Sequence, residues 1–470
     1  MSAQVQALQP HHIRPLAQIP PAGVDFFDPV PFKVYTQRDL DRIAPLARLT
    51  SEQRFEMKVV SSVLPFRVNQ YVIDELIDWS KVPDDPIFQL TFPQRGMLAP
   101  EHYERIAGLI RGGADKAELE RAVGEVRHAL NPHPADQMEM NMPRDEHGKR
   151  LEGMQHKYRE TVLFFPTQGQ TCHSFCSFCF RWAQFVGDKE LRICSSEAAE
   201  LHGYLRRHPE VTDLLVTGGD PMVMKTRHLR DFLEPLLQPE FDHVQTIRIG
   251  SKALTFWPHR FLGADDADDL IRLLTQLVEA GKHVALMAHY NHWKELDTEA
   301  AQAAIRRIRS TGAVIRAQGP LVAHINDDPA VWAKLWKLEV KLGLVPYYMF
   351  VERDTGARNY FEVPLVRAWE IYREAMQQVS GLARTARGPS MSASPGKVEI
   401  QGVAEIAGEK VFVLRFIQGR NPDWVQRPFF AKFDDKATWL DQLVPAFGEE
   451  KWFWQDEYNA IREDRLGHAA

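Results

Sequence analysis

The sequence predicts an α/β fold, in which a parallel sheet curves into a partial (βα)6 barrel between an N-terminal helical domain and a C-terminal hairpin and tail. Two observations predict this fold. Short β-branched or apolar runs alternate with helical stretches from residue 161 onward, and between about residues 37 and 127 the apolar residues recur at helical spacing. Strands that alternate with helices pair in parallel, because each helix carries the chain back across the sheet.

The first part of the chain is expected to hold an arm and a helical domain. The arm, residues 1–36, is rich in proline and lacks a periodic pattern, so it is expected either to wrap a neighbouring subunit or to stay disordered. The helical domain, residues 37–153, has a helix start at Thr50 and further helices at 100–110 and 117–130. Residues 131–153 are polar and form a connector.

The barrel is expected over residues 154–385. Its expected strands are 162–166, 213–217, 246–250, 283–288, 314–318 and 344–351, with helices at 195–207, 228–237, 267–280, 297–310 and 329–342. Residues 386–470 are expected to form a C-terminal segment with hairpin strands at 398–400 and 411–416 and an aromatic tail at 424–454. That tail either docks on another subunit, which would make a homo-oligomer, or packs on its own barrel.

Composition argues against several classes of protein. The 470 residues include 57 basic and 63 acidic side chains, a net charge of −6, and no long basic block, so nucleic-acid binding is not expected. No apolar run approaches the roughly 18 residues of a membrane span, and the N-terminus lacks a signal-peptide pattern. Four cysteines, three of them in one stretch, are a poor disulfide framework. A soluble protein of the reducing cytoplasm is therefore expected.

Three cysteines follow the first expected strand at the spacing C-x3-C-x2-C: Cys172, Cys176 and Cys179. Three thiolates from one loop can hold three irons of a [4Fe-4S] cluster, and the fourth iron is then open to bind and reduce S-adenosylmethionine. The alternatives are three buried unpaired cysteines, or a non-catalytic iron-sulfur protein that carries or senses electrons.

Polar residues follow the other expected strands, and in such folds catalytic groups gather at the strand C-terminal ends. After the second strand a pair of glycines can let the amino-acid end of S-adenosylmethionine approach the backbone. The other strand ends can hydrogen-bond a cofactor or adenosine, or only cap the strands. The expected cofactor-binding residues are Gly218, Gly219, Asp220, Ser251, His289 and Gln318. Metal ligation by His289 and His292 is a weaker hypothesis, because no third ligand is apparent.

Two cations outside these strand ends are candidate catalytic residues. Arg181 lies two residues past the last cysteine, where its guanidinium can bind a substrate carboxylate bidentately or form a structural ion pair. Lys397 follows a flexible loop of small residues. A desolvated lysine can react with an aldehyde cofactor, although a lysine after glycine is usually a solvated surface residue.

These residues resemble the lysine 2,3-aminomutase family of radical SAM enzymes, over about residues 64–416. The resemblance rests on motifs in one order along the chain: Leu64-Pro65-Phe66-Arg67, Tyr158, the cysteine loop with Arg181, Gly218-Gly219-Asp220, Arg248-Ile249-Gly250-Ser251-Lys252, His289-Tyr290-Asn291-His292, Gln318, Asn326-Asp327, Pro346-Tyr347-Tyr348 and Pro395-Gly396-Lys397.

The resemblance implies an isomerase, an amino-acid 2,3-aminomutase with three cofactors. The [4Fe-4S] cluster and S-adenosylmethionine would generate a 5′-deoxyadenosyl radical that takes hydrogen from the β-carbon of an amino acid. Pyridoxal 5′-phosphate, held by Lys397 and Tyr158, would carry the amino group, and Arg181 would hold the substrate carboxylate. A flavodoxin- or ferredoxin-type protein would supply electrons.

The chain departs from the family pattern at four places. Only Gly396 separates Pro395 from Lys397, and Thr161 stands where the family has a phosphate-contacting arginine, which Arg159 could replace. The two aspartates that read the ammonium of lysine are altered: one position matches Ala393, and the other falls at Arg353 or, with a one-residue shift, at Asp354.

Loss of negative charge from the side-chain pocket disfavours a cationic substrate. The predicted substrate is therefore an α-amino acid other than lysine, with an acidic or neutral side chain. The runner-up function is a radical SAM enzyme of the same scaffold without the pyridoxal step, such as an epimerase, a desaturase or a peptide-modifying enzyme.

Overall fold

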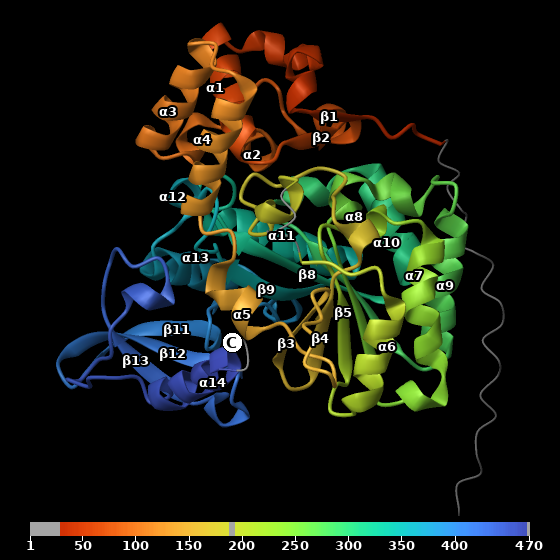
Figure 1. Ribbon diagram of the computed structural model, residues 1–470, viewed down its shortest axis with the longest axis vertical. Coiled ribbons are helices and arrows are strands. Elements are labelled where there is room, and N and C mark those ends of the chain that lie inside the picture. Colours follow the sequence, from red (N-terminus) through yellow and green to blue (C-terminus); the bar gives the residue numbers. More distant parts are fainter. Residues whose placement is uncertain (1–28, 188–192, 468–470) are drawn as a thin grey trace, which may run out of the picture.

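A computed structural model describes residues 29–187 and 193–467, which form three packed parts (Figure 1). A helical domain lies at the top of the view, an α/β unit on the right and a C-terminal sheet at the lower left. In the described residues, the strands of the two lower parts join in one eleven-stranded sheet with the order β13-β12-β11-β10-β9-β8-β7-β6-β5-β4-β3.

The helical domain is built on four helices: α1 (Ser51–Val63), α2 (Pro86–Thr91), α3 (Pro100–Arg111) and α4 (Lys116–Ala129). The expected helix start is confirmed, because the Thr50 hydroxyl accepts a hydrogen bond from the Gln53 amide and the Gln53 side chain accepts one from the Thr50 amide. The helices expected at 100–110 and 117–130 are confirmed to within a residue.

The expected arm is wrong at its C-terminal end. Strand β1 (Val34–Thr36) pairs antiparallel with β2 (Arg67–Asn69), so these residues belong to the helical domain of their own chain. Three residues that alternate in a ladder give too short a signal to be read from sequence. Residues 1–28 lie outside the described part of the chain.

All six expected parallel strands are confirmed, and each pairs with the next along the chain. They are β4 (Thr161–Phe164), β5 (Asp213–Val216), β6 (Thr246–Ser251), β7 (His283–His289), β8 (Val314–Leu321) and β9 (Val345–Val351). The α/β class is therefore confirmed, while the curvature of a partial barrel stays a prediction.

Helices connect the parallel strands and cover one side of the sheet, where α6, α7, α9 and α10 line the right of Figure 1. The helices of this part are α6 (Ala198–Arg207), α7 (Thr226–Leu233), α8 (Ala253–Phe256), α9 (Ala267–Glu279), α10 (Glu299–Arg309), α11 (Pro329–Leu342), α12 (Arg358–Phe361) and α13 (Leu365–Gln377).

Successive side chains of a strand point to opposite faces of the sheet, so that one face contributes to the core and the other to the candidate site. In β5 the side chains of Leu214 and Val216 are fully buried in the core shared with the helices, whereas Leu215 lines a cavity on the opposite face. In β6, Ile247 belongs to the core and Gly250 to the same cavity. The period of two along a strand thus places apolar packing on one face and chemistry on the other.

Two strands extend the parallel set in ways that the sequence pattern did not reveal. The connector contains the short helix α5 (Gln137–Met140) and leads into β3 (Met154–Tyr158), which pairs antiparallel with β4. Within the expected flexible loop, β10 (Arg387–Ser392) pairs in parallel with β9. The expectation of a flexible loop before Lys397 is therefore wrong for its middle part, where backbone pairing holds the chain.

The C-terminal part contains the expected hairpin in a longer form. Strands β11 (Gly396–Ile406) and β12 (Glu409–Gly419) pair antiparallel, β13 (Pro428–Lys432) adds to β12, and α14 (Gln455–Gly467) ends the described chain. Trp424, Trp439 and Trp454 are buried with Phe416 against this sheet. The aromatic tail thus packs on its own chain, against the hairpin and also against the α/β part, where the Leu365 amide donates to the carbonyl oxygen of Ala437 at 2.8 Å.

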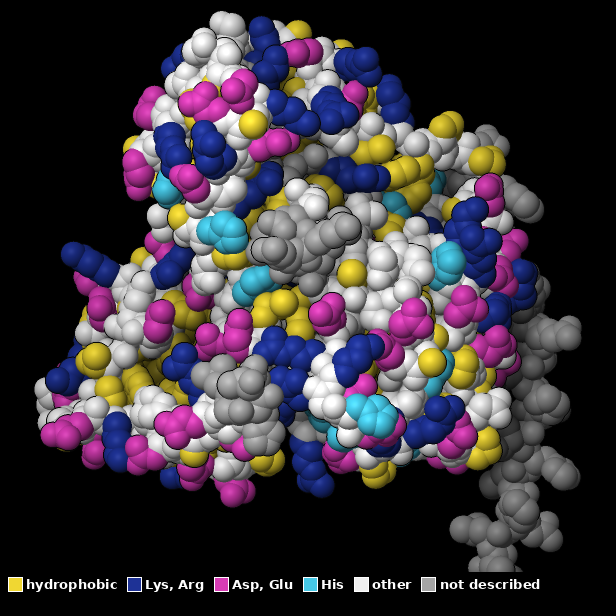
Figure 2. Space-filling model, viewed as in Figure 1, with side chains coloured by type: hydrophobic (Ala, Val, Ile, Leu, Met, Phe, Trp, Pro, Cys, Tyr) yellow, Lys and Arg dark blue, Asp and Glu magenta, His cyan; other side chains and the backbone are white. Residues whose placement is uncertain are grey.

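The surface carries both signs of charge. On the face shown in Figure 2, acidic and basic side chains are interspersed over the helical domain and over the helices of the α/β part. Among the described helices, none combines the length and the apolar character that crossing a membrane requires.

Candidate active site

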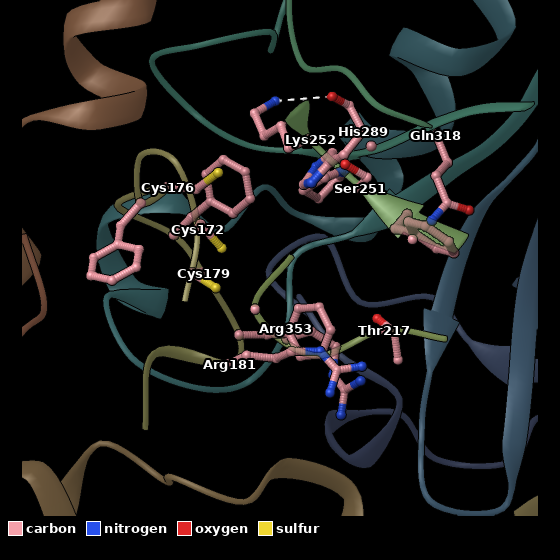
Figure 3. Close-up of a pocket in the computed structure, with 18 of the residues that line it drawn as sticks. Cys172, Cys176, Cys179, Arg181, Thr217, Ser251, Lys252, His289, Gln318 and Arg353 are labelled. Atoms are coloured by element: carbon pink, nitrogen blue, oxygen red, sulfur yellow. Dashed lines mark hydrogen bonds between the residues drawn. The ribbon is translucent and has the colours of Figure 1, made fainter. Parts of the chain in front are cut away.

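The three cysteines of the loop line one cavity of about 280 Å³ at the C-terminal ends of the parallel strands. Their sulfur atoms gather on one side of it (Figure 3). Burial raises the pKa of Cys172 well above its usual range and that of Cys179 to about 11. Buried thiols that convert to thiolates need a compensating positive charge, which an iron-sulfur cluster supplies.

A cluster suits this arrangement better than a single ion does. In the described residues no group of three His, Cys, Asp or Glu side chains converges on one point that could hold a metal ion. In a [4Fe-4S] cube each cysteine binds a different iron, so the sulfur atoms surround the cube without meeting at one point. The donor set therefore fits the cluster that the spacing predicts.

Ser251, His289 and Gln318 lie across the cavity from the sulfur atoms (Figure 3). Burial lowers the pKa of His289 well below its usual value, so its ring is neutral. Its Nε2 atom is buried and has no hydrogen-bond partner within the described residues. A buried ring nitrogen of this kind is a ready partner for a ligand in the cavity.

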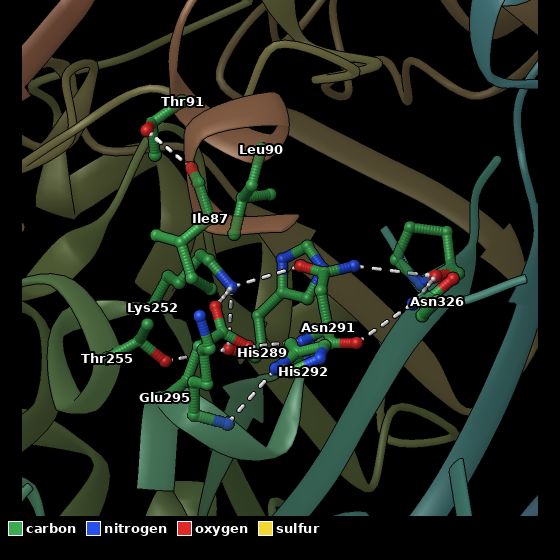
Figure 4. A network of polar contacts seen from close by, with 12 residues as sticks. Ile87, Leu90, Thr91, Lys252, Thr255, His289, Asn291, His292, Glu295 and Asn326 are labelled. Atoms are coloured by element: carbon green, nitrogen blue, oxygen red, sulfur yellow. Dashed lines mark hydrogen bonds and ion pairs between the residues drawn. The ribbon is translucent and has the colours of Figure 1, made fainter. Parts of the chain in front are cut away.

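A buried polar network supports this wall (Figure 4). The Lys252 ammonium lies 2.7 Å from a Glu295 carboxylate oxygen and also donates to Asn291 Oδ1 and to the carbonyl oxygen of His289, each at 3.1 Å. The second Glu295 oxygen accepts from the His292 amide at 2.8 Å. Because its charges are paired and hydrogen-bonded, the network can hold the β7 end in one position.

His292 does not line the cavity. Its Nδ1 atom accepts a hydrogen bond from the Lys294 amide, 3.2 Å away, and so caps the turn after β7. The hypothesis that His289 and His292 ligate a metal together finds no support in this geometry. The alternative role, a polar cap at a strand end, describes His292.

The two glycines after β5 line the cavity, where cofactor binding by them stays a prediction, and they also have a packing role. Gly218 has φ +144°, and a Cβ atom on Gly219 would lie 2.4 Å from the carbonyl oxygen of Thr171. Their small size lets this turn pack against the chain just before Cys172, Gly218 against Gln170 and Gly219 against Thr171. The sequence analysis singled out the two glycines but did not predict this close packing.

Asp220 ties the same turns together. Its amide donates to the carbonyl oxygen of Thr171 at 2.7 Å, and its carboxylate accepts from the amides of Met222 and Lys252, each at 2.9 Å. Burial raises its pKa to about 6. The side chain does not line the cavity in this structure, where it holds neighbouring turns together; cofactor binding by Asp220 stays a prediction.

A second cavity, of about 190 Å³, adjoins the first. Its walls include Tyr158 and five basic side chains, and no aspartate or glutamate lines it; the basic residues are Lys157, Arg181, Arg248, Arg353 and Lys397. An enclosed site with this charge favours a phosphate or carboxylate ligand. Arg159, the possible substitute for the phosphate-contacting arginine, is exposed and does not line this cavity.

Lys157 and Arg248 are candidate site residues that sequence reasoning did not single out. Lys157 lies on β3, the strand missed in the sequence, and donates to the carbonyl oxygen of Ala393. Arg248 is bound to Asp213 through Nε at 2.8 Å, and Thr161 Oγ1 donates to the same carboxylate at 3.0 Å. Thr161, which stands where the family has an arginine, lines the cavity but brings no charge to it.

Lys397 is the second residue of β11 and lines the second cavity. Burial, together with the nearby guanidinium groups of Arg248, Arg387 and Arg353, lowers its pKa to about 7. The ammonium lies 4.2 Å from the centre of the Tyr348 ring. A Cβ atom on Gly396 would lie 2.4 Å from the carbonyl oxygen of Gln418, so one glycine suffices for the close strand pairing that presents Lys397.

Arg181 belongs to both cavities. The two cavities share five wall residues: Phe180, Arg181, Leu215, Arg353 and Ser392. The Arg181 guanidinium stacks over the rings of Phe165 and Phe180, 4.5 and 4.9 Å from their centres. Within the described residues no carboxylate pairs with it. It is therefore available to a carboxylate ligand between the cysteines and Lys397.

Of the two alternatives for side-chain recognition, Arg353 faces the site and Asp354 does not. Arg353 lies beside Arg181 in Figure 3, and its Nε atom is buried without a hydrogen-bond partner in the described chain. The Asp354 carbonyl oxygen accepts from Asn131 Nδ2 at 2.7 Å, and its side chain lines neither cavity. Ala393 is buried.

Comparison with known proteins gives the following relatives. No family model matches the chain. An Aquifex aeolicus protein provisionally named L-lysine 2,3-aminomutase is 30% identical over 408 residues, 86% of this chain and 95% of that protein. L-lysine 2,3-aminomutase of Bacillus subtilis is 24% identical over 384 residues, 81% of this chain and 71% of that enzyme.

One solved structure is similar at a low level. The radical SAM methyltransferase from Sphaerobacter thermophilus has a TM-score of 0.34 and 14% identity, and the match covers 62% of this chain and 95% of that one. A likeness of this size carries no argument about the present chain.

Proposed function

Because the chain belongs to the lysine 2,3-aminomutase family, whose members are isomerases, we propose that it moves the α-amino group of an amino acid to the β-carbon. The observation that carries the proposal is that Arg181 and Lys397 line one cavity, and that Arg181 also lines the cavity of the three cysteines. A substrate held by its carboxylate at Arg181 would lie within reach of both.

The family implies a [4Fe-4S] cluster and S-adenosylmethionine, and we extend the proposal to pyridoxal phosphate. When bound, these groups supply hydrogen abstraction and a carrier for the amino group. Cys172, Cys176 and Cys179 would hold the cluster, with His289 and Gln318 on the facing wall. Lys397 would bind the pyridoxal aldehyde carbon, and the surrounding cations would hold its phosphate. A flavodoxin- or ferredoxin-type protein is the proposed electron donor.

We further propose that the side chain of the substrate is acidic or neutral. Arg353 is the group at the altered side-chain position, and it lines both cavities. Glu352 is the one carboxyl group among the residues that line the two cavities, and burial raises its pKa well above its usual range. A neutral carboxyl group does not attract a cation, so the cavities lack the charge that a lysine ammonium needs.

The proposed function is tested by supplying isotopically labelled lysine, glutamate and neutral amino acids to the reduced, cluster-reconstituted enzyme under anaerobic conditions. We expect β-amino isomers from an acidic or a neutral substrate, detected by mass spectrometry. Efficient conversion of lysine alone would contradict the proposed substrate class. Cleavage of S-adenosylmethionine without any β-amino product would favour the runner-up function, a radical SAM enzyme of the same scaffold without the pyridoxal step.

Replacement of Arg353 by alanine is expected to change the choice of substrate. Charge-assisted hydrogen bonds contribute roughly 1.5–3 kcal/mol, so kcat/KM for an acidic amino acid should fall about ten- to a hundredfold. For neutral amino acids kcat/KM should change little. The exposed Arg373 on α13 offers a matched control as Arg373→Ala. An equal loss for acidic and neutral substrates would contradict side-chain recognition by Arg353.

Reaction of Lys397 with pyridoxal phosphate is expected to have its midpoint near neutral pH. The neutral amine attacks the aldehyde, and the lowered pKa of about 7 makes about half of the amine neutral at pH 7 and about a tenth at pH 6. The measurement is the borohydride-trapped adduct at Lys397 against pH, by peptide mass spectrometry. A midpoint near pH 10, as for a lysine in a solvated peptide, would contradict this expectation.

A further inference from the structure

The cysteine loop packs against the helical domain, in a hydrophobic core that also includes residues of the α/β part. Phe178 and Trp182, which flank Cys179, are buried in the hydrophobic core that contains Ile87 and Phe88 of α2 and Val72. The parallel strands have a separate core shared with their connecting helices. The side chains around the cluster ligands therefore depend on the N-terminal domain for their packing.

Strand β2 of the helical domain holds the first half of the loop. The carbonyl oxygen of Arg67 accepts a hydrogen bond from the Phe175 amide at 2.8 Å. The Asn69 amide donates to Ser174 Oγ at 3.0 Å, and Asn69 Nδ2 donates to the carbonyl oxygen of His173 at 3.3 Å. Three consecutive residues between Cys172 and Cys176 are thus bound to two residues of one strand.

Helix α2 holds the second half of the loop. Ser177 donates its amide to the carbonyl oxygen of Leu90 at 2.8 Å, and its hydroxyl lies 2.7 Å from the carbonyl oxygen of Gln89. These carbonyl groups belong to the last turn of α2, where no further turn of helix donates hydrogen bonds to them. Ser177 therefore satisfies the end of the helix and is itself held between Cys176 and Cys179.

The α2 helix is in turn anchored to the α/β part. Its capping residue Asp85 accepts hydrogen bonds from the Ile87 and Phe88 amides and pairs with the Lys294 ammonium at 2.6 Å. Figure 4 shows the α2 residues beside the Lys252 network. One rigid path therefore runs from the wall behind His289 through α2 to the cysteine loop.

We propose that the helical domain positions the cluster loop, with Asn69 and Ser177 as the two positioning residues. The inference rests on the proposed function, because it assumes that the three cysteines bind a cluster. Hydrogen bonds to the residues between the three cysteines hold the loop in one conformation before a cluster is bound. Groups of this kind orient ligands and affect metal affinity by tenfold or more.

The test compares Ser177→Ala and Asn69→Ala with the unchanged chain. In metal-free protein, amide exchange at Phe175 and Ser177 should become about five- to tenfold faster, as expected for loss of one hydrogen bond. In the cluster-loaded protein, iron loss to a chelator should accelerate by a similar factor. Ser177→Thr, which keeps the hydroxyl, should restore both rates towards those of the unchanged chain.

Ser62→Ala is the matched control, because its hydroxyl bonds only the carbonyl oxygen of Val59 in its own helix α1. Variants whose amide exchange and iron loss equal those of Ser62→Ala would overturn the inference. If the unchanged chain bound no iron, the proposed function would fall. Amide exchange in the metal-free protein would still decide whether the helical domain holds the loop.

Discussion

Lys397→Ala is expected to abolish turnover of amino acids, with a loss on the order of 10³-fold or more, the scale seen when a covalent catalytic group is removed. Lys397 lines the second cavity, and its pKa is lowered to about 7. The variant should also lose the absorbance band of enzyme-bound pyridoxal phosphate that borohydride removes. Lys157, which lines the same cavity, is already bound to the carbonyl oxygen of Ala393.

The control for this variant is Lys432→Ala, which removes an exposed lysine from β13 of the same C-terminal sheet. It should retain turnover and the absorbance band. Iron content and reductive cleavage of S-adenosylmethionine should persist in Lys397→Ala, because the cysteines line the other cavity. A variant that retains amino-group migration would remove Lys397 from the proposed chemistry. Loss of S-adenosylmethionine cleavage would point instead to a general structural defect.

The sequence predicted the elements with long, regular patterns and missed the short or irregular ones. The six parallel strands follow from continuous apolar runs between helices, and α1 from its capping residues. Strand β10 was read as a loop, because its glycine, proline and serine residues have low strand propensity and pairing with β9 outweighs that preference. Strand β3 carries polar residues that face a cavity, so its pattern has no apolar side to detect.

The candidate site was predictable where residue type alone indicates chemistry, and not where geometry decides. The positions of the cysteines, Arg181 and Lys397 came from motif spacing. Spacing could not choose between Arg353 and Asp354, since neighbouring residues point in different directions and only the fold turns Arg353 into the cavity. The packing reason for Gly219 was equally hidden, because it depends on Thr171, which is distant in sequence.

Arg181→Ala is expected to lower kcat/KM for every amino acid by about 10²- to 10³-fold. The argument is that Arg181 would bind the α-carboxylate, which all amino acids share, in a buried site without a competing carboxylate. Removing one partner of a buried charge pair costs roughly 2–5 kcal/mol. Arg181→Lys should recover only part of the loss, because an ammonium keeps the charge but cannot make two parallel hydrogen bonds to a carboxylate.

The pattern across substrates separates Arg181 from Arg353. Both guanidinium groups line the same two cavities, so a general effect of cavity charge would make their variants alike. If Arg181 binds the α-carboxylate, Arg181→Ala should lower kcat/KM equally for acidic and neutral substrates. Arg353→Ala should lower kcat/KM for acidic substrates selectively. Arg181 is two residues from Cys179, so its replacement could disturb the cluster. The iron content of Arg181→Ala is therefore measured as a control and must equal that of the unchanged chain. A loss confined to one class of side chain would mean that Arg181 reads the side chain and that the carboxylate is bound elsewhere.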